Sequence, residues 1–248
     1  MVRLKLLIEY DGSNYVGWQR QKSGKTIQEE IEKCLKVLCK SDIPLFAAGR
    51  TDAGVHALGQ VAHFDIEPDK FEIKKICTAL NSLLQKNKNS ITILNCKRVS
   101  SSFHARFSAK KKTYHYKIYN RKFKSFIWEN KVWFVNKELC LISMQNSSKY
   151  LLGTHDFNAF RSSNCQADNA ERSIDDIRVS KKNNIINIRI TARSFLHNQV
   201  RIIVGTMCDI GKGKWDVIKM KEILESKNRN LAGITAPPSG LYLEKIYY

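Results

Sequence analysis

Hydrophobic and polar side chains alternate at the start of the chain, as they do in a strand with one buried face. Apolar residues stand at positions 2, 4, 6 and 8, with Arg3, Lys5 and Glu9 between or beside them, which predicts a strand over 2–8. Thr26 and Glu29 then form a capping box, and apolar residues recur at helical spacing from there to position 38. This pattern predicts a helix that starts just after Thr26.

The rest of the first hundred residues continues the alternation of strands and helices. Two strands are expected at 44–48 and 60–66, on either side of a glycine-bearing loop, and a strand at 91–96. Between them, a second helix is expected to open at Asp69 and to carry Ile76, Leu80 and Leu83 on its apolar face. The order β-α-β-β-α-β is that of a ferredoxin-like unit.

The second part of the chain repeats this order with longer insertions. The expected elements are a strand at 114–119, a helix at 139–152, strands at 174–179 and 185–191, a helical stripe over 196–207 and a closing strand at 241–247. The sequence therefore predicts an α+β fold of two ferredoxin-like (βαββαβ) halves, residues 1–105 and 106–248.

Three segments, 11–25, 120–138 and 154–172, are loop-like and long for a compact domain. The middle one mixes basic and aromatic residues from Arg121 to Trp128. This mixture suits phosphate contacts combined with base stacking, although an aromatic insertion can equally pack onto its own domain.

The charge and the cysteine content indicate which class of partner the protein binds and in which cell compartment it works. The 248 residues carry 42 Lys and Arg against 23 Asp and Glu, a formal net charge of +19, which favours nucleic acid as partner over a lysine-rich surface kept only for solubility. No apolar run is long enough for a membrane span or a secretory signal. Seven cysteines without a C-x-x-C spacing indicate neither a zinc site nor a disulfide framework, so we expect no metal and a reducing cytoplasm.

The stretch richest in candidate chemistry runs from Gly49 to His56. It reads Gly-Arg-Thr-Asp-Ala-Gly-Val-His and holds one carboxylate, Asp52, with Arg50 two residues before it. The spacing matches neither of the glycine-rich phosphate-binding motifs. An aspartate between glycines is commonly a turn residue bonded to its own backbone, and this alternative stands beside a catalytic one.

The same stretch resembles the catalytic-loop signature of the pseudouridine synthases of the TruA family. Further matching stretches occur in the family's order. They are Tyr10-Asp-Gly with Gly17-Trp-Gln, Phe103-His-Ala-Arg-Phe-Ser-Ala109 before Tyr114, Phe195-Leu-His-Asn-Gln-Val-Arg-Ile-Ile-Val-Gly205, and Thr235-Ala-Pro-Pro-Ser-Gly-Leu-Tyr-Leu243. The resemblance covers residues 2 to 247.

The resemblance implies a role for each of five residues. Asp52 matches the catalytic aspartate, and Arg201 matches its basic partner, whose charge stabilises the ionised carboxylate. Arg50 is expected to hold the flipped nucleotide or its phosphates. Tyr114 matches the tyrosine that stacks on the target base, and Leu241 the apolar residue that closes the uracil pocket.

Two further expectations concern histidines. His197 and Arg201 are four residues apart and should share one helix face. His56, His63 and His104 lie in the matched motifs, and we interpret them as structural or RNA-contacting rather than catalytic.

The function implied is isomerisation of uridine to pseudouridine at positions 38, 39 and 40 of tRNA, without a cofactor, in a cleft between the two halves of a cytoplasmic homodimer. Whether Asp52 attacks C1′, attacks the base or abstracts a ribose proton stays open. The alternatives are a non-catalytic RNA-binding or RNA-chaperone protein, weakened because no RRM signature is present, and a hydrolase, for which no second carboxylate or Ser/Cys nucleophile stands in a matching motif.

Overall fold

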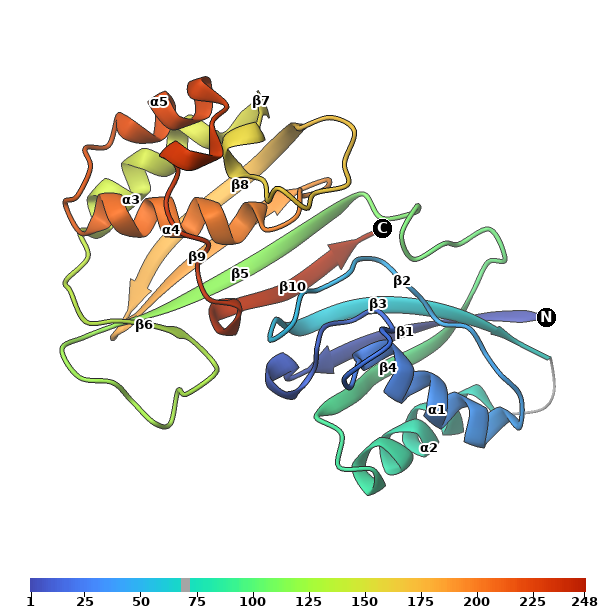
Figure 1. Ribbon diagram of the computed structural model, residues 1–248. Coiled ribbons are helices and arrows are strands. Elements are labelled where there is room, and N and C mark those ends of the chain that lie inside the picture. The colour runs from blue at the N-terminus through green and yellow to red at the C-terminus, as the bar shows by residue number, and fades with distance from the viewer. Residues whose placement is uncertain (68–71) are drawn as a thin grey trace. The chain divides into compact units, whose positions relative to one another are not determined.

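The computed structural model describes residues 1–67 and 72–248 as a mixed α+β protein whose strands are mostly antiparallel. These residues form two compact units, one of residues 1–110 together with 242–248 and one of residues 111–241. Figure 1 gives the course of the chain. No helix in the described residues has the length and apolar character that crossing a membrane requires.

The first unit is built in the element order expected from the sequence. Along the chain its elements are β1 (Val2–Tyr10), η1 (Gly12–Asn14), α1 (Ile27–Cys39), β2 (Phe46–Ala47), β3 (His56–Ile66), α2 (Ile73–Lys86) and β4 (Ile91–Val99), joined by β10 (Leu241–Tyr247) from the C-terminus. Asp69, the expected start of the second helix, lies outside the described residues, and the helix begins at Ile73.

The strands of this unit form a sheet in which β1 lies between β4 and β3 and is antiparallel to both. β3 also pairs with β2, antiparallel at His63, and with β10, parallel at His56. Alternate residues of β1 are fully buried, namely Leu4, Leu6 and Ile8, as expected for a strand with one face on the core. The buried stripes of α1 and α2 complete that core, and both helices lie along the same side of the sheet in Figure 1.

The cap predicted for α1 is present. The Thr26 hydroxyl accepts a hydrogen bond from the Glu29 amide at 3.4 Å, which satisfies one of the amides left open at a helix start. In α2, the fully buried residues are Ile76, Leu80 and Leu84. The predicted Leu83 is half-buried, one position away from the buried stripe.

The second unit contains the expected elements from the strand at 114–119 to the helix over 196–207 and several more, whereas the closing strand expected here at 241–247 is β10 and is grouped with the first unit. Along the chain the elements of the second unit are β5 (Lys111–Asn120), β6 (Trp133–Val135), α3 (Leu141–Ser148), η2 (Lys149–Leu151), β7 (Gly153–Asp156), η3 (Asn158–Phe160), β8 (Glu171–Lys182), β9 (Ile185–Ala192), α4 (Gln199–Gly211), α5 (Lys219–Ser226), η4 (Arg229–Leu231) and η5 (Pro238–Gly240).

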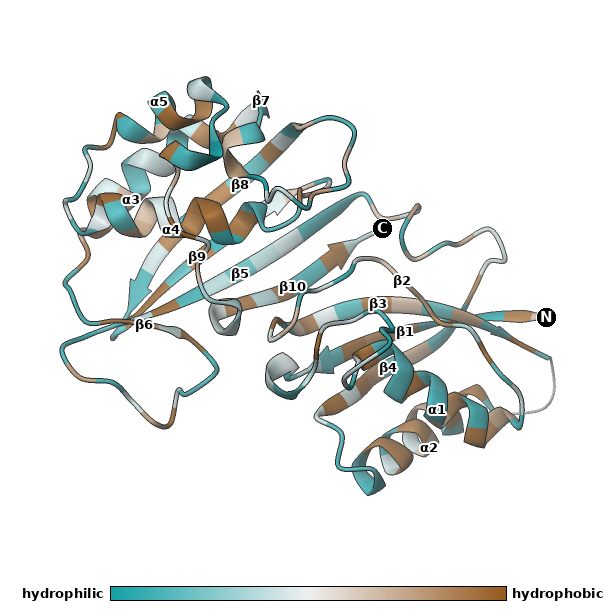
Figure 2. Cartoon of the chain, viewed as in Figure 1, coloured by the Kyte–Doolittle hydropathy of each residue, from teal (hydrophilic) through white to brown (hydrophobic). Residues whose placement is uncertain are grey.

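Its sheet runs β5-β9-β8-β7 with antiparallel pairs, and β6 adds to β5 in parallel. Every second residue of β9 from Ile186 to Ala192 is buried. Helix α4 is buried along nearly its whole length and is brown over its middle in Figure 2. It is therefore the central helix of this unit's core, with α3 and α5 packed against it.

Three sequence-based expectations were wrong in detail here. The helix expected over 139–152 is shorter, because α3 ends at Ser148 and a 3-10 turn follows it. Of the segments expected to be loops, 120–138 contains β6, and 154–172 contains most of β7, η3 and the start of β8. His197 precedes α4 rather than sharing a helix face with Arg201, because Asn198 has a left-handed backbone (φ 62°) and the helix begins at Gln199.

Candidate active site

Asp52 lies in the connection between β2 and β3. It is the first residue of a turn that is closed by a hydrogen bond to the Asp52 carbonyl. The Val55 amide donates to the Asp52 carbonyl at 3.1 Å, and Gly54 within the turn has a φ of 75°, a conformation that glycine adopts without strain. The Asp52 side chain is half-buried, whereas Arg50 two residues earlier is exposed. The loop therefore carries one half-buried carboxylate and, two residues before it, one exposed guanidinium.

The residues around Asp52 are held by the segment that follows β1. The Tyr10 hydroxyl bonds the Thr51 hydroxyl at 2.7 Å, and both side chains are buried. The Trp18 amide donates to the Thr51 carbonyl at 3.0 Å, and the Gly54 amide donates to the Tyr15 carbonyl at 3.3 Å. Because these bonds fall on both sides of Asp52, its backbone has little freedom to move.

The Tyr10-Asp-Gly motif is explained by a close approach of two backbones. The Gly12 amide donates to Nδ1 of the buried His56 at 3.1 Å, and a Cβ on Gly12 would overlap the Val55 carbonyl oxygen. Only glycine fits this crossing. His56 in turn stacks on Tyr242 of β10, with 4.7 Å between ring centroids, so its position is fixed by packing and hydrogen bonding.

Gln60 secures the start of the loop from the strand side. Its amide nitrogen donates to the Gly49 carbonyl at 2.8 Å, and its side chain is fully buried. Burial raises the pKa of Tyr10, although hydrogen bonds from Thr51 and Gln60 partly oppose the shift. The hydroxyl therefore stays protonated at neutral pH and remains part of this network.

The second unit supplies the other three expected site residues. Tyr114 is half-buried on β5 and meets Phe195 edge to face, with 5.1 Å between ring centroids. Arg201, in the first turn of α4, donates from Nε to the Ala236 carbonyl at 2.7 Å and from a terminal nitrogen to Asn198 Oδ1 at 2.8 Å. Its guanidinium is thus oriented by its own unit.

Leu241 is buried at the first position of β10, directly after the 3-10 turn η5. That turn rests on Tyr116 of β5, whose hydroxyl donates to the Pro237 carbonyl at 2.7 Å. The turn therefore fixes where Leu241 begins the last strand.

Comparisons with known proteins bear on what this set of residues does. A family model described as tRNA pseudouridine synthase matches residues 6–108 and 148–248. Over its full length the chain is 48% identical to tRNA pseudouridine synthase A of Wolbachia pipientis wMel and 45% identical to that of Anaplasma phagocytophilum, each covered completely. It is 42% identical to the protein of the same name from Brucella ovis, of which 98% is covered.

The chain belongs to the tRNA pseudouridine synthase family. Members of this family are isomerases that convert uridine to pseudouridine in tRNA. Arg50, Asp52, Arg201 and Leu241 all lie within the parts matched by the family model. Tyr114 lies in the stretch between those parts, as does the segment that joins β5 to β6.

Sequence reasoning missed two residues that hold the loop around Asp52 in place. Tyr10 stood in a matched motif without a role, and Gln60 had no signal at all because its contact with Gly49 spans a loop rather than a pattern. Across residues 1–67 and 72–248, no group of three or more His, Cys, Asp and Glu side chains could hold a metal ion.

Proposed function

We propose that this chain isomerises uridine to pseudouridine at positions 38, 39 and 40 of tRNA, with Asp52 as the catalytic carboxylate. The reaction breaks the bond from C1′ to N1 of the uracil and forms one from C1′ to C5. The hydrogen on C5 is lost as a proton and N1 gains one, so no electrons are exchanged with another molecule. An ionised carboxylate can serve this reaction as nucleophile or as base.

The other residues act around this carboxylate. Arg50 holds the flipped nucleotide or its phosphates, and Arg201 is the basic partner that stabilises the negative charge of Asp52. Tyr114 stacks on the target base and Leu241 closes the uracil pocket. Asp52 and Arg50 come from the first unit and the remaining three from the second.

One observation carries this proposal. The backbone on both sides of Asp52 is bonded to the segment 10–18, through the Trp18 amide to Thr51 and the Gly54 amide to Tyr15. A turn residue of no function needs no such second layer of support. A catalytic group does, because small displacements of a reacting atom cost a large part of the rate.

The test is Asp52→Asn, which keeps the shape of the side chain and removes its charge. Pseudouridine formation is expected to fall by orders of magnitude, since an amide is neither nucleophile nor base. The affinity for tRNA should stay within a few-fold, because phosphate contacts by many basic residues supply most of it. Asp42→Asn is the matched control, since Asp42 is exposed and pairs with the exposed Lys36 at 2.9 Å, and it should keep full activity.

The outcomes separate enzyme from binding module. A folded Asp52→Asn protein that makes pseudouridine at the wild-type rate would show that the chemistry lies elsewhere. Equal loss of binding and activity would favour the turn-residue alternative. A wild-type protein that binds tRNA and never makes pseudouridine would be the RNA-binding or chaperone protein.

We further propose that the two halves expected at 1–105 and 106–248 are ferredoxin-like units, with residues 242–248 grouped with the first, and that the protein works as a cytoplasmic homodimer. The first unit supports this by its element order β1-α1-β2-β3-α2-β4 and by its strand neighbours β4-β1-β3-β2. Sedimentation of the purified protein tests the assembly, where a monomer at micromolar concentration would contradict the dimer.

A further inference from the structure

The segment that joins β5 to β6 exposes large apolar side chains to water. Phe123 is 69% exposed, Phe126 79% and Ile127 90%. Figure 2 shows brown residues along the far end of this loop. Adjacent exposed apolar residues on a folded unit mark a binding surface.

Basic side chains alternate with these apolar ones. Arg121, Lys122, Lys124 and Lys131 stand against the single carboxylate of Glu129 in residues 121–131. The Arg121 guanidinium lies 4.8 Å from the ring centroid of Tyr119, Lys122 Nζ 5.3 Å from that of Phe123, and Lys124 Nζ 5.6 Å from that of Phe126. Each of these three cations therefore sits beside a ring, so that one ligand could meet a charge and an aromatic face together.

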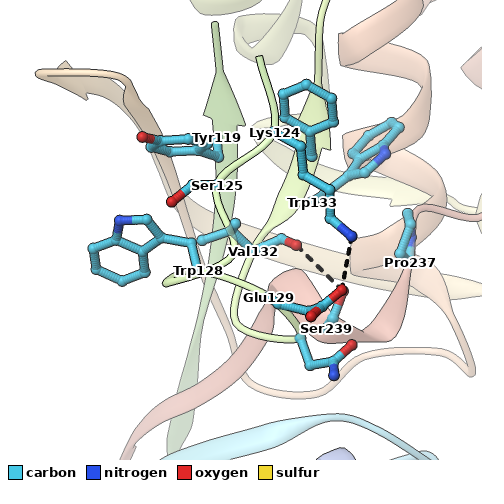
Figure 3. Close-up of a pocket in the computed structure, with 11 residues that line it drawn as sticks. Tyr119, Lys124, Ser125, Trp128, Glu129, Val132, Trp133, Pro237 and Ser239 are labelled. Atoms are coloured by element: carbon cyan, nitrogen blue, oxygen red, sulfur yellow. Dashed lines mark hydrogen bonds and ion pairs between the residues drawn. The ribbon is translucent and has the colours of Figure 1, made fainter.

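A pocket of about 260 Å³ opens under this segment. Figure 3 shows the aromatic side chains of Tyr119, Trp128 and Trp133 in its lining, with the ion pair of Lys124 and Glu129 beside them. That pair joins Nζ and Oε1 at 2.7 Å. Since pockets for drug-sized ligands measure roughly 300–1,000 Å³, this one has room for a single planar ring.

We propose that residues 121–131 and this pocket bind unpaired nucleotides of the tRNA other than the one that reacts. We call these residues and the pocket the β5–β6 surface. Alternating cations and rings fit a single strand, whose phosphates meet the cations while its bases stack on the rings. The inference rests on the proposed function, because it takes tRNA as the substrate.

A second copy of the chain fits this surface less well than RNA does. A two-fold contact sets the same patch of both copies together, and here it would bring four cations of each copy against those of the other. The net charge of +19 adds to that repulsion, whereas it attracts a polyanion.

The first test variant is Phe126→Ala, with Ile142→Ala as the matched control. Ile142 is 67% exposed, on α3 of the same unit. Phe126→Ala should weaken binding of full-length tRNA by roughly 5- to 150-fold, which corresponds to the ~1–3 kcal/mol of one stacked base. The kcat at saturating tRNA should be unchanged, and Ile142→Ala should match the wild type in both.

Lys122→Gln separates charge from stacking. Removing one phosphate contact should make the slope of log K against log salt less steep by about 0.7 to 0.9, whereas Phe126→Ala should lower the affinity at every salt concentration and keep the slope. Ultraviolet cross-linking of wild-type protein to tRNA should map to peptides from residues 121–131.

Three outcomes would overturn the proposal while the wild type still makes pseudouridine. The first is that Phe126→Ala leaves the dissociation constant for tRNA unchanged, and the second is that it lowers kcat while that dissociation constant stays unchanged. The third is that Phe126→Ala converts a dimer to a monomer with unchanged affinity per protomer, which would make the β5–β6 surface an interface between copies. If the wild type makes no pseudouridine, the proposed function itself fails, and unchanged cross-links to 121–131 would still report the surface.

Discussion

The Tyr10 hydroxyl and the Thr51 hydroxyl are hydrogen-bonded at 2.7 Å in the interior of the first unit. Thr51 directly precedes Asp52 in the chain. Forty-one residues separate Tyr10 and Thr51 in sequence. The last residue of β1 thus determines where the residue before the candidate catalytic carboxylate lies. Because Tyr10 is buried with its hydroxyl bonded to Thr51, we expect it to position the loop rather than to react.

Tyr10→Phe tests that role, since it deletes one hydroxyl and keeps the packing. We expect kcat at saturating tRNA to fall roughly 10- to 100-fold, because a loosened loop misplaces the Asp52 carboxylate. The dissociation constant for tRNA should not change. Single-turnover assays with a parallel binding titration measure both quantities.

Tyr15→Phe is the matched control for this prediction. The Tyr15 hydroxyl is bonded to Asn89 Oδ1 at 3.1 Å and to the Ser90 amide at 3.0 Å, away from residues 49–54. Each variant should lose about 1–3 kcal/mol of stability, since Tyr10→Phe removes the partner of the buried Thr51 hydroxyl and Tyr15→Phe removes two part-buried hydrogen bonds. Equal losses of kcat in both variants would mean that Tyr10 acts on stability alone.

The affinity for tRNA should fall steeply with salt, because the excess of cations in this chain is large. Each phosphate that is neutralised contributes about −0.9 to the slope of log K against log salt for duplex RNA-like contacts and about −0.7 for single strands. Titrations between roughly 50 and 200 mM salt measure the slope. A slope near zero would show that the positive charge does not serve binding.

The first unit could be predicted closely because its signals are local. The alternation in β1 and the cap at Thr26 each depend on a few adjacent residues. β3 starts at His56 rather than at Gln60, since His56 and Ala57 pair with Tyr242 and Leu243 from the far end of the chain. A pairing of such separation leaves no periodic pattern.

The second unit was predicted less well for the same physical reason. β6 is a three-residue strand that exists because it adds to β5 at Ile118, and α5 is a short helix with only Met220, Ile223 and Leu224 buried. In the candidate site, too, local motifs could be predicted from the sequence and long-range contacts could not. The motif located Asp52, but the contacts of Tyr10 and Gln60 that hold its loop appear only after folding.

His63 should make the protein less stable in mild acid. It is buried on β3, accepts a hydrogen bond at Nδ1 from the Ala105 amide at 3.2 Å and stacks on Phe46. Burial, followed by the nearby His104 and Arg3, lowers the pKa of His63 to about 4, although Asp65 opposes the shift. The unfolded chain has the ordinary value of about 6.5 and so binds more protons than the folded chain between these two pH values.

The part of the folding free energy that depends on neutral His63 is therefore fully present above pH 6.5 and is lost as the pH falls toward 4. The loss reaches up to about 3 kcal/mol, the equivalent of the difference between the two pKa values. Urea denaturation at several pH values measures it. His63→Asn should be less stable at pH 7, because packing is lost, and should show a smaller loss between pH 6.5 and 4. The same pH dependence in both proteins would contradict the assignment to His63.

Gly205→Ala should destabilise the second unit even though alanine is the better helix former. Alanine in place of glycine inside a helix stabilises the helix by about 1 kcal/mol. However, a Cβ on Gly205 would overlap the carbonyl oxygen of Ile234. The segment after Ile234 binds α4 through backbone, with the Ala236 amide donating to the Arg201 carbonyl at 3.1 Å. Moving that segment should cost about 2–4 kcal/mol in net stability. It should also disturb Arg201, whose Nε donates to the Ala236 carbonyl.

Gly211→Ala, in the same helix, is the control. A Cβ on Gly211 would meet the flexible Met144 side chain at 2.9 Å, so this substitution should change stability by less than about 1 kcal/mol. Thermal melts of both variants decide the matter, and similar melting temperatures for the two would mean that the backbone contact at Gly205 is not what holds the segment on α4.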